Sequence, residues 1–236
     1  MNDDEEFLEQ RQQMLAVIAA KTIFSCGRLG KAALSPRVMK ALASVPRHHF
    51  VPLELQAHAY DDRPLPIGCG KTISQPFIVA VMTELLDLQP TDTVLEIGTG
   101  LGYQTAMLAR LARRVCSMEL IEALAAQARR RLAQQGCSNV EIRVGNGWRG
   151  WPERAPFDKI LVAAAPELIP PTLVRQLKPG GKMVLPAGPP DEQQLVLLVK
   201  DASGLVTSRD IFGVRFSLLD GGAAAASGWG PTSPPA

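Results

Sequence analysis

The sequence predicts an α/β fold of the Rossmann-like kind: a mostly parallel, twisted sheet with helices on both faces, an N-terminal helical extension and antiparallel C-terminal strands. Two observations lead to this fold class. From Ser74 onward, short apolar runs typical of buried strands alternate with longer segments of helical periodicity. In addition, the apolar run 93–97 ends in the glycine-rich turn GTGLG, residues 98–102, which leads directly into a helix. At 236 residues the chain is long enough to bury a sizeable core, and we expect one domain over residues 1–219.

The first 60 residues are expected to form a helical part that precedes the core. Apolar residues at near-helical spacing, with no internal proline or glycine, predict a helix over 6–24. A Ser-Pro pair at 35–36 suits the N-cap and first turn of a second helix that runs to about residue 45. Residues 47–52 are predicted to make an extended turn, and 61–71, rich in proline and glycine, an irregular loop.

The core, residues 61–219, follows the alternation of strands and helices. Helices are predicted over 75–88, 102–112, 121–135 and 171–177, and the third stops at a glycine suited to a helix C-terminus. Strands are predicted over 93–97, 114–119, 140–144, 157–163 and 182–186. Two later apolar segments, 194–200 and 205–216, have no helix between them and predict an antiparallel hairpin that closes the sheet. The tail, 220–236, has almost no core-forming residues and is expected to be disordered.

The glycine spacing indicates the kind of ligand that this sheet would bind. In open parallel sheets, ligands bind beyond the carboxyl ends of the strands. That rule gathers residues 96–102, Glu119, 145–148 and 163–166 on one rim. A dinucleotide fingerprint, GxGxxG, would need its third glycine at position 103, which is Tyr103, so an NAD site is disfavoured.

Two polar residues on this rim are candidate nucleoside contacts. Glu119 ends the strand 114–119 and can accept hydrogen bonds from both hydroxyls of a ribose, although it could also simply cap the next helix. Asn146, in the turn after the strand 140–144, can donate and accept as an adenine edge requires. The alternative is an Asn-Gly turn, with Gly147, that binds nothing.

Ser74 is the candidate substrate contact. Its structural interpretation is the N-cap of the following helix, with Pro76 in the first turn. Its functional interpretation is that the hydroxyl and the nearby N–H groups hold an acidic substrate. The preceding GKT, residues 70–72, is no phosphate loop, because that motif would need a glycine at position 65 and a strand before it.

Composition argues against several functional classes. The four cysteines show no CxxC pairing and there are three histidines, so we expect no metal site. The net charge of +2 gives no reason to expect nucleic acid or an anionic membrane as partner. No apolar run has the length of a membrane span, and the acidic start is unlike a secretory signal, so a cytoplasmic protein is expected.

Five segments together resemble the protein-L-isoaspartate O-methyltransferase family, whose members are class I methyltransferases dependent on S-adenosylmethionine (AdoMet). They are RHHFVP at 47–52, GKTISQP at 70–76, VLEIGTGLGYQT at 94–105, GNGW at 145–148 and APFD at 155–158. The resemblance runs from about residue 8 to residue 217. It implies methyl transfer from AdoMet to the α-carboxylate of L-isoaspartyl residues in damaged proteins and peptides, which starts their repair to aspartyl. We expect a monomer.

The resemblance also implies roles for individual residues. Ser74 would be the catalytic residue, with Thr72, Ile73 and Ser217 as further substrate contacts. The implied cofactor-binding residues are Glu96, Gly98, Thr99, Gly100, Gly102, Glu119, Asn146 and Gly147. A carboxylate nucleophile is already ionised at neutral pH and the thioether leaves as a neutral group, so this chemistry needs alignment and desolvation rather than a general base.

The sequence departs from the family pattern in three places, which leaves alternatives open. Aspartate commonly stands at the position of Asn146, histidine and glutamine often stand at Cys69 and Lys71, and the run FSLL at 216–219 replaces a Phe-Val-Pro-Leu type of end. A carboxyl methyltransferase for one dedicated peptide and a non-catalytic AdoMet-binding module therefore stay possible. The run AAAP at 163–166 argues against an amide or adenine N-methyltransferase, because those enzymes usually carry an Asn/Asp-Pro-Pro-aromatic motif there.

Overall fold

The computed structural model of the protein describes residues 6–220. Its strands are β1 (Leu65–Gly68), β2 (Lys71–Ile73), β3 (Thr93–Ile97), β4 (Arg114–Glu119), β5 (Val140–Val144), β6 (Phe157–Val162), β7 (Leu177–Ala187), β8 (Gln194–Lys200) and β9 (Val206–Gly213). Its α-helices are α2 (Leu8–Phe24), α3 (Cys26–Leu29), α4 (Pro36–Ser44), α5 (Pro76–Leu86), α6 (Tyr103–Ala109), α7 (Glu122–Gln134) and α8 (Pro171–Gln176). Short 3-10 helices are η1 (Arg47–Phe50), η2 (Leu53–His58), η3 (Gly147–Arg149) and η4 (Pro152–Arg154).

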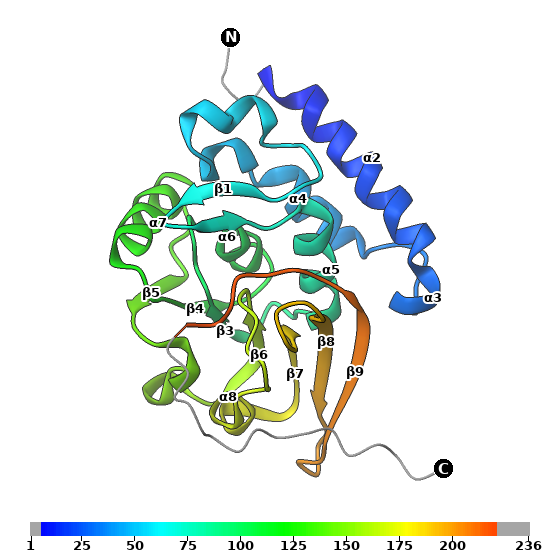
Figure 1. The fold of residues 1–236 in the computed structure, drawn as a ribbon, viewed down its shortest axis with the longest axis vertical. Helices are drawn as coiled ribbons and strands as arrows, with labels where there is room; N and C mark the ends of the chain where they lie inside the picture. Colours follow the sequence, from blue (N-terminus) through cyan, green and yellow to red (C-terminus); the bar gives the residue numbers. More distant parts are fainter. Residues whose placement is uncertain (1–5, 221–236) are drawn as a thin grey trace.

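A seven-stranded sheet forms the centre of the molecule, in the order β5-β4-β3-β6-β7-β8-β9 (Figure 1). Strands β3 to β7 pair in parallel, whereas β8 pairs antiparallel with both β7 and β9. The strand order reverses beside β3, because β4 and β5 lie on one side of it and β6 lies on the other. The predicted fold class, including the closing antiparallel hairpin, is confirmed.

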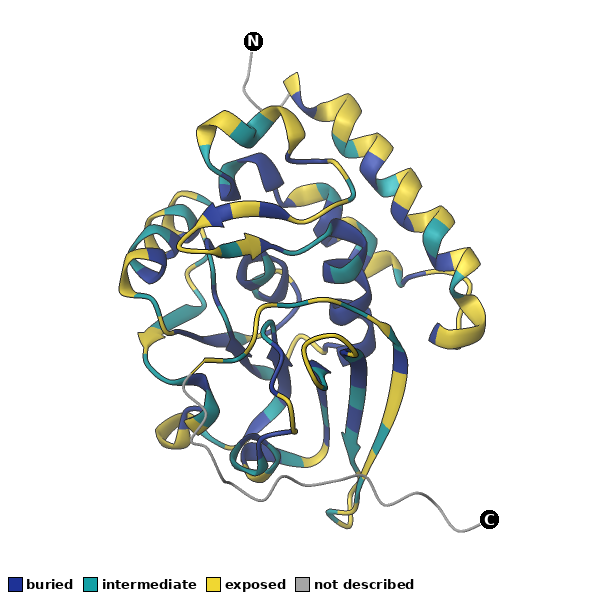
Figure 2. Ribbon diagram, viewed as in Figure 1, coloured by how far each residue is buried: buried dark blue, intermediate teal, exposed yellow. Residues whose placement is uncertain are grey.

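The two faces of the sheet bury separate apolar clusters, as the alternation of side chains along each strand requires. Val94 and Val115 point into the cluster that packs against α2, α4, α5, α6 and α7. Their neighbours Leu95 and Cys116 point into the cluster on the other face, with Trp151 and residues of α8. Helix α5 is buried along nearly its whole length, because it lies between the sheet and the N-terminal helices (Figure 2).

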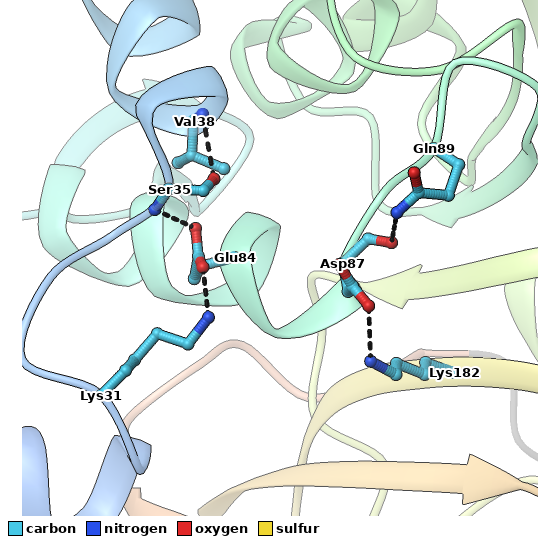
Figure 3. Close-up of polar contacts among 7 residues, drawn as sticks. All are labelled: Lys31, Ser35, Val38, Glu84, Asp87, Gln89 and Lys182. Atoms are coloured by element: carbon cyan, nitrogen blue, oxygen red, sulfur yellow. Dashed lines mark hydrogen bonds and ion pairs between the residues drawn. The ribbon is translucent and has the colours of Figure 1, made fainter.

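The N-terminal helical part is held to the core by α5. Ser35 caps α4 as predicted, since its hydroxyl accepts a hydrogen bond from the Val38 N–H. The Glu84 carboxylate of α5 accepts from the Ser35 N–H at 2.9 Å and pairs with Lys31 at 2.5 Å (Figure 3). At the end of α5, Asp87 pairs with Lys182 of β7. One helix thus joins the N-terminal part to the sheet through charged contacts as well as apolar ones.

Three local predictions are wrong. Residues 61–71 are predicted as a loop, yet β1 and β2 form an antiparallel hairpin there, whose turn at Gly68, Cys69 and Gly70 has positive φ throughout. Residues 47–52 are predicted as extended, but η1 occupies 47–50 and buries Arg47, His48 and Phe50. Apolar periodicity misses both because each stretch has only two buried apolar side chains, Leu65 and Ile67 in the first and Phe50 and Val51 in the second.

The third error concerns the start of α5. Ser74 is predicted as its N-cap, but the N-cap is Gln75 and its side chain makes no capping hydrogen bond. Asp62 does this instead, since its Oδ1 accepts from the Phe77 N–H at 2.9 Å. A carboxylate at a helix N-terminus satisfies a free N–H and favours the helix dipole. Ser74 therefore does not cap α5.

The tail predicted over 220–236 lies, apart from Asp220, outside the described residues. Within residues 6–220, no helix is long and apolar enough to cross a membrane.

Candidate active site

A cavity of about 940 Å³ opens at the carboxyl ends of the parallel strands. Its walls come from segments far apart in sequence: the β2–α5 turn, the ends of β3, β4, β5 and β6, and residues 214–220 after β9. The rim predicted from the sheet topology contributes Gly98, Gly100, Glu119, Gly145, Gly147 and Ala163. The β2–α5 turn adds Thr72 and Ser74 to the same cavity. Most of the predicted site is thus brought into one place.

The glycine turn after β3 needs glycine for two reasons. Gly98, Gly100 and Gly102 all have positive φ, at 93°, 58° and 100°, where other residues are strained. A side chain would also crowd its neighbours, since a Cβ would stand 3.2 Å from Ile67 Cδ1 at Gly100 and 3.1 Å from Leu132 Cδ1 at Gly102. The turn therefore presents bare backbone to the cavity at Gly98 and Gly100, while Gly102 lies behind it at the start of α6.

Glu119 connects this turn to the end of β4. Its two carboxylate oxygens accept from the Gly100 N–H at 2.8 Å and from the Ile121 N–H at 3.0 Å. Each oxygen keeps a second lone pair, and the residue lines the cavity. The same carboxylate can therefore hold the turn and accept hydrogen bonds from two hydroxyls of a ligand.

Glu96 lies beneath the turn, fully buried and away from the cavity wall. Its Oε2 accepts from Thr105 at 2.6 Å and from Ser117 at 2.5 Å, and Ser117 in turn contacts the Thr99 hydroxyl at 2.6 Å. Thr99 is also buried. These two predicted cofactor contacts thus sit behind the glycine turn, where they connect β3, β4, α6 and the turn itself.

The Glu96 carboxyl provides the first testable prediction. Burial raises its pKa from an ordinary 4.5 to about 7, against the lowering effect of its hydroxyl donors. Between these two pH values the folded protein keeps this proton, whereas the unfolded chain has lost it. The raised pKa therefore contributes to the free energy of unfolding below pH 4.5, and this contribution is lost as the pH rises to 7. Glutamine at position 96 stays neutral at every pH, so the Glu96→Gln variant lacks this pH dependence. Between pH 4.5 and 8 we expect the free energy of unfolding to decrease by about 3 kcal/mol more in the wild type than in the variant. Urea unfolding at a series of pH values measures this, with the exposed Glu54→Gln as control, and equal pH dependence in Glu96→Gln and wild type would contradict it.

Ser74 lines the cavity, and its hydroxyl makes no hydrogen bond within residues 6–220. Its backbone is held from below by Arg47, whose Nη2 donates to the Ser74 carbonyl at 2.8 Å and whose Nε donates to the Ala59 carbonyl at 2.7 Å. Arg47 is fully buried and stacks on Tyr103, with Cζ 4.8 Å from the ring centroid. Sequence reasoning did not assign Arg47 a role, and the only signal was its place in the segment RHHFVP.

Asn146 and Ile73 are two further predicted contacts that do not line the cavity. The Asn146 Oδ1 caps η3 by accepting from the Trp148 N–H at 2.9 Å, and Ile73, the last residue of β2, is buried. Gly147 does line the cavity, and a Cβ there would come within 2.3 Å of Ile97 Cγ2. The adenine role of Asn146 stays a prediction.

Residues 214–220, which we call the C-terminal strap, cross the top of the cavity after β9 ends (Figure 1). Buried Gln193 accepts from the Phe216 N–H at 2.6 Å and donates to its carbonyl at 3.1 Å. Ser217 and Leu219 exchange backbone hydrogen bonds with Ala165. The strap ends at Asp220, which pairs with Lys71 at 2.7 Å across the mouth. Sequence analysis predicted strand up to residue 216 and so missed this cover, although it named Ser217, which lines the cavity.

Among residues 6–220 there is no cluster of three or more histidine, cysteine or acidic side chains that could hold a metal ion.

Comparison with known proteins identifies the family. The family described as Protein-L-isoaspartate(D-aspartate) O-methyltransferase (PCMT) matches residues 21–223. A Protein-L-isoaspartate O-methyltransferase 1 from Polaromonas is 66% identical over 215 residues, which cover 91% of each chain. A Protein-L-isoaspartate O-methyltransferase 2 from Syntrophobacter fumaroxidans is 52% identical, over 93% of this chain and 89% of its own.

Solved structures agree with this result. A protein-L-isoaspartate O-methyltransferase superposes with a TM-score of 0.75 at 27% identity, over 89% of this chain and 66% of that one. A Plasmodium falciparum protein in complex with S-adenosyl-L-homocysteine shares the fold, with a TM-score of 0.69 at 22% identity over 85% of this chain and 97% of its own. With a family match over most of its length and relatives above 50% identity, the chain belongs to the protein-L-isoaspartate(D-aspartate) O-methyltransferase family.

Proposed function

We propose that the cavity transfers a methyl group from AdoMet to the α-carboxylate of an L-isoaspartyl residue, and that Ser74 contacts this carboxylate. As a member of its family, the protein is an AdoMet-dependent protein-L-isoaspartate O-methyltransferase that starts the repair of isoaspartyl proteins. The observation that carries the assignment of residues is a single cavity, in which Ser74 and Thr72 lie with Gly98, Gly100 and Glu119. The hydroxyls of Ser74 and Thr72 can donate hydrogen bonds to a carboxylate. The bare backbone at Gly98 and Gly100 and the carboxylate of Glu119 can contact a nucleoside.

The cofactor half of the cavity fits AdoMet. Glu119 presents lone pairs for the ribose hydroxyls, and the glycine turn lets the methionine part approach bare backbone at Gly98 and Gly100. Gly147 packs directly against Ile97, where a side chain would not fit, and presents bare backbone to the part of the cavity proposed for the base. When bound, AdoMet supplies a methyl group activated by a sulfonium. Glu96 and Thr99 contribute indirectly, since their hydrogen bonds hold the turn from behind.

The substrate half of the cavity needs to orient and shield a carboxylate. That group is ionised at neutral pH, so Ser74 is not required as a base. The Ser74 hydroxyl, which has no hydrogen-bond partner among residues 6–220, can donate to one carboxylate oxygen and leave the other free to attack. Arg47 keeps Ser74 in place by holding its carbonyl. The C-terminal strap forms one wall of the cavity, and shielding by it would favour transfer from a carboxylate that must lose part of its hydration.

The decisive experiment compares two synthetic peptides that differ only in carrying an L-isoaspartyl or an L-aspartyl residue. We expect base-labile label from AdoMet on the isoaspartyl peptide alone, and Ser74→Ala to lower kcat/KM by about 10- to 100-fold, because it loses one hydrogen bond to a charged group. Ser138→Ala, in an exposed loop, is the control. Label on neither peptide, with AdoMet still bound, would favour a dedicated acceptor or a non-catalytic AdoMet-binding module.

The remaining proposals concern context. Residues 1–219 would act as one methyltransferase domain, because the N-terminal part supplies Arg47 to the site in the core. We further propose a cytoplasmic monomer that acts on isoaspartyl proteins and peptides and engages neither nucleic acid nor membranes; the net charge of +2 supports the last point. Light scattering of the purified protein tests the monomer, and a mass of twice the chain would overturn it.

A further inference from the structure

A second, smaller cavity of about 560 Å³ adjoins the active site. It lies between the end of α2, α3 and the edge strand β9, and is lined by Lys21, Phe24, Ser25, Gly27, Arg28, Gln75, Phe77, Ile78, Phe212 and Gly213. Gln75, Ile78 and Gly213 line both cavities. The two therefore share a wall, and a chain that leaves the active site past these three residues enters the second cavity. We call it the flanking groove.

The floor of the flanking groove is aromatic. Phe77 of α5 and Phe212 of β9 stack with ring centroids 6.2 Å apart at an interplanar angle of 18°. Phe24, at the end of α2, is 89% exposed although it lines the same groove. Figure 2 shows the exposed end of α2 and the neighbouring α3 beside the sheet. The exposed Phe24 ring and the two stacked rings leave apolar surface that a ligand could bury. Binding of an apolar side chain between Phe24 and these rings would therefore be favourable.

The shape of the groove suits a polypeptide. Strand β9 is the last strand of the sheet, so in the described residues its outer edge has no neighbouring strand. An extended peptide can hydrogen-bond to such an edge while its alternate side chains enter pockets. The groove is also held in shape from both sides, since Arg209 of β9 donates to the Arg28 carbonyl at 2.7 Å and Lys21 pairs with Asp62 at 2.5 Å. A preformed groove continuous with the active site suits residues next to the one that is methylated.

We propose that the flanking groove binds a large apolar side chain, aromatic or aliphatic, of the substrate polypeptide, close in sequence to the isoaspartyl residue. This inference rests on the proposed function and adds a substrate preference to it. Phe24 is the residue that sets the preference, and it touches neither the cofactor half nor the substrate half of the active cavity. Because the groove binds substrate away from the reacting atoms, the effect belongs in KM rather than in kcat.

The test uses isoaspartyl octapeptides of otherwise serine and alanine, with one phenylalanine moved through each position on both sides, together with a short isoaspartyl tripeptide. We expect wild type to prefer phenylalanine at one or two positions by about 5- to 10-fold in kcat/KM. Phe24→Ala should reduce that preference to below about twofold and leave the tripeptide unaffected. Ile23→Ala, which removes a neighbouring side chain that is 59% exposed and lies outside the groove, should retain the preference.

The outcomes separate this inference from the function on which it rests. Methylation of every isoaspartyl peptide without positional preference, or a preference that survives Phe24→Ala, would overturn the groove assignment alone. Methylation of none of them, the tripeptide included, would overturn the proposed function. A wild-type dimer in light scattering that Phe24→Ala converts to monomer would assign this face to a second copy of the chain, and so would also overturn the groove assignment.

Discussion

Replacing Glu119 by glutamine is expected to weaken AdoMet binding by about 100- to 1000-fold. The carboxylate of Glu119 accepts two backbone N–H groups, those of Gly100 and Ile121. The glutamine side chain has one oxygen, which can replace one of the two carboxylate oxygens as acceptor. Its NH₂ group then faces the other backbone N–H, so two donors meet and that hydrogen bond is lost. The proposed contact with the ribose is weakened as well. Each hydrogen bond to a charged group contributes about 1.5–3 kcal/mol, and two losses near the lower end, about 3–4 kcal/mol together, correspond to the expected 100- to 1000-fold.

Calorimetric titration of AdoMet into the purified variant measures this effect. Glu122→Gln is a matched control, because Glu122 is exposed at the start of α7, three residues further on. A far-ultraviolet circular dichroism spectrum like that of the wild type would confirm that the Glu119 variant is folded. Binding by Glu119→Gln within about threefold of the wild type would refute the assignment of Glu119 as a cofactor contact.

Removing the Arg47 side chain is expected to have the largest effect on stability. Arg47→Ala leaves the Ser74 and Ala59 carbonyls without their donor and opens a cavity beside Tyr103. Burial lowers the Arg47 pKa to about 10, so the guanidinium remains charged at neutral pH and its hydrogen bonds are charge-assisted. We expect a loss of about 3–5 kcal/mol in the free energy of unfolding, from lost hydrogen bonds and from the cavity. Urea unfolding at pH 7.5 measures it, and Arg63→Ala, which removes an exposed ion pair with Asp61, should change stability by less than about 1 kcal/mol.

Arg47→Lys separates the positioning role from the structural one. Lysine keeps the charge but has no fork with which to reach two carbonyls. At a temperature where this variant is fully folded, we expect kcat for the isoaspartyl peptide to fall while the Kd for AdoMet stays near the wild-type value, because Arg47 holds Ser74 rather than the cofactor turn. Unchanged kcat in Arg47→Lys would show that Arg47 acts on stability alone.

Glu119 and Arg47 would contribute to the site in different ways. Glu119 would act directly, at the surface of the cavity, whereas Arg47 would act through the main chain of a residue that lines it. Lys71 would contribute in a third way. It stands where the family resemblance leads us to expect glutamine, and it pairs with Asp220 across the mouth of the cavity. That pair joins the start of β2 to the end of the C-terminal strap, so we expect a substitution at Lys71 to change how the cavity is covered rather than how it binds the cofactor.

The sequence by itself was sufficient for the alternating part of the fold and for the set of residues that gather at the carboxyl ends of the parallel strands. Strand 194–200 is found with the predicted bounds because it is an apolar run with polar ends, and strand 140–144 because apolar residues alternate with charged ones. The turn at 98–102 was predictable since positive φ and close approach demand glycine, and glycine is visible in a sequence. The parallel topology then placed Glu119, Gly145 and Gly147 at one edge without further information.

Contacts between distant residues were decided only by the tertiary structure. Local patterns could not show that Asp62, rather than Ser74, caps α5, or that Glu96 lies behind the turn instead of in the cavity. They also could not show that Arg47 supports Ser74 from 27 residues away, or that Asp220 meets Lys71 across 149 residues. Periodicity and turn preferences depend on neighbours within a few positions, whereas hydrogen-bond partners, burial and cavity walls depend on which segments the packed core brings together.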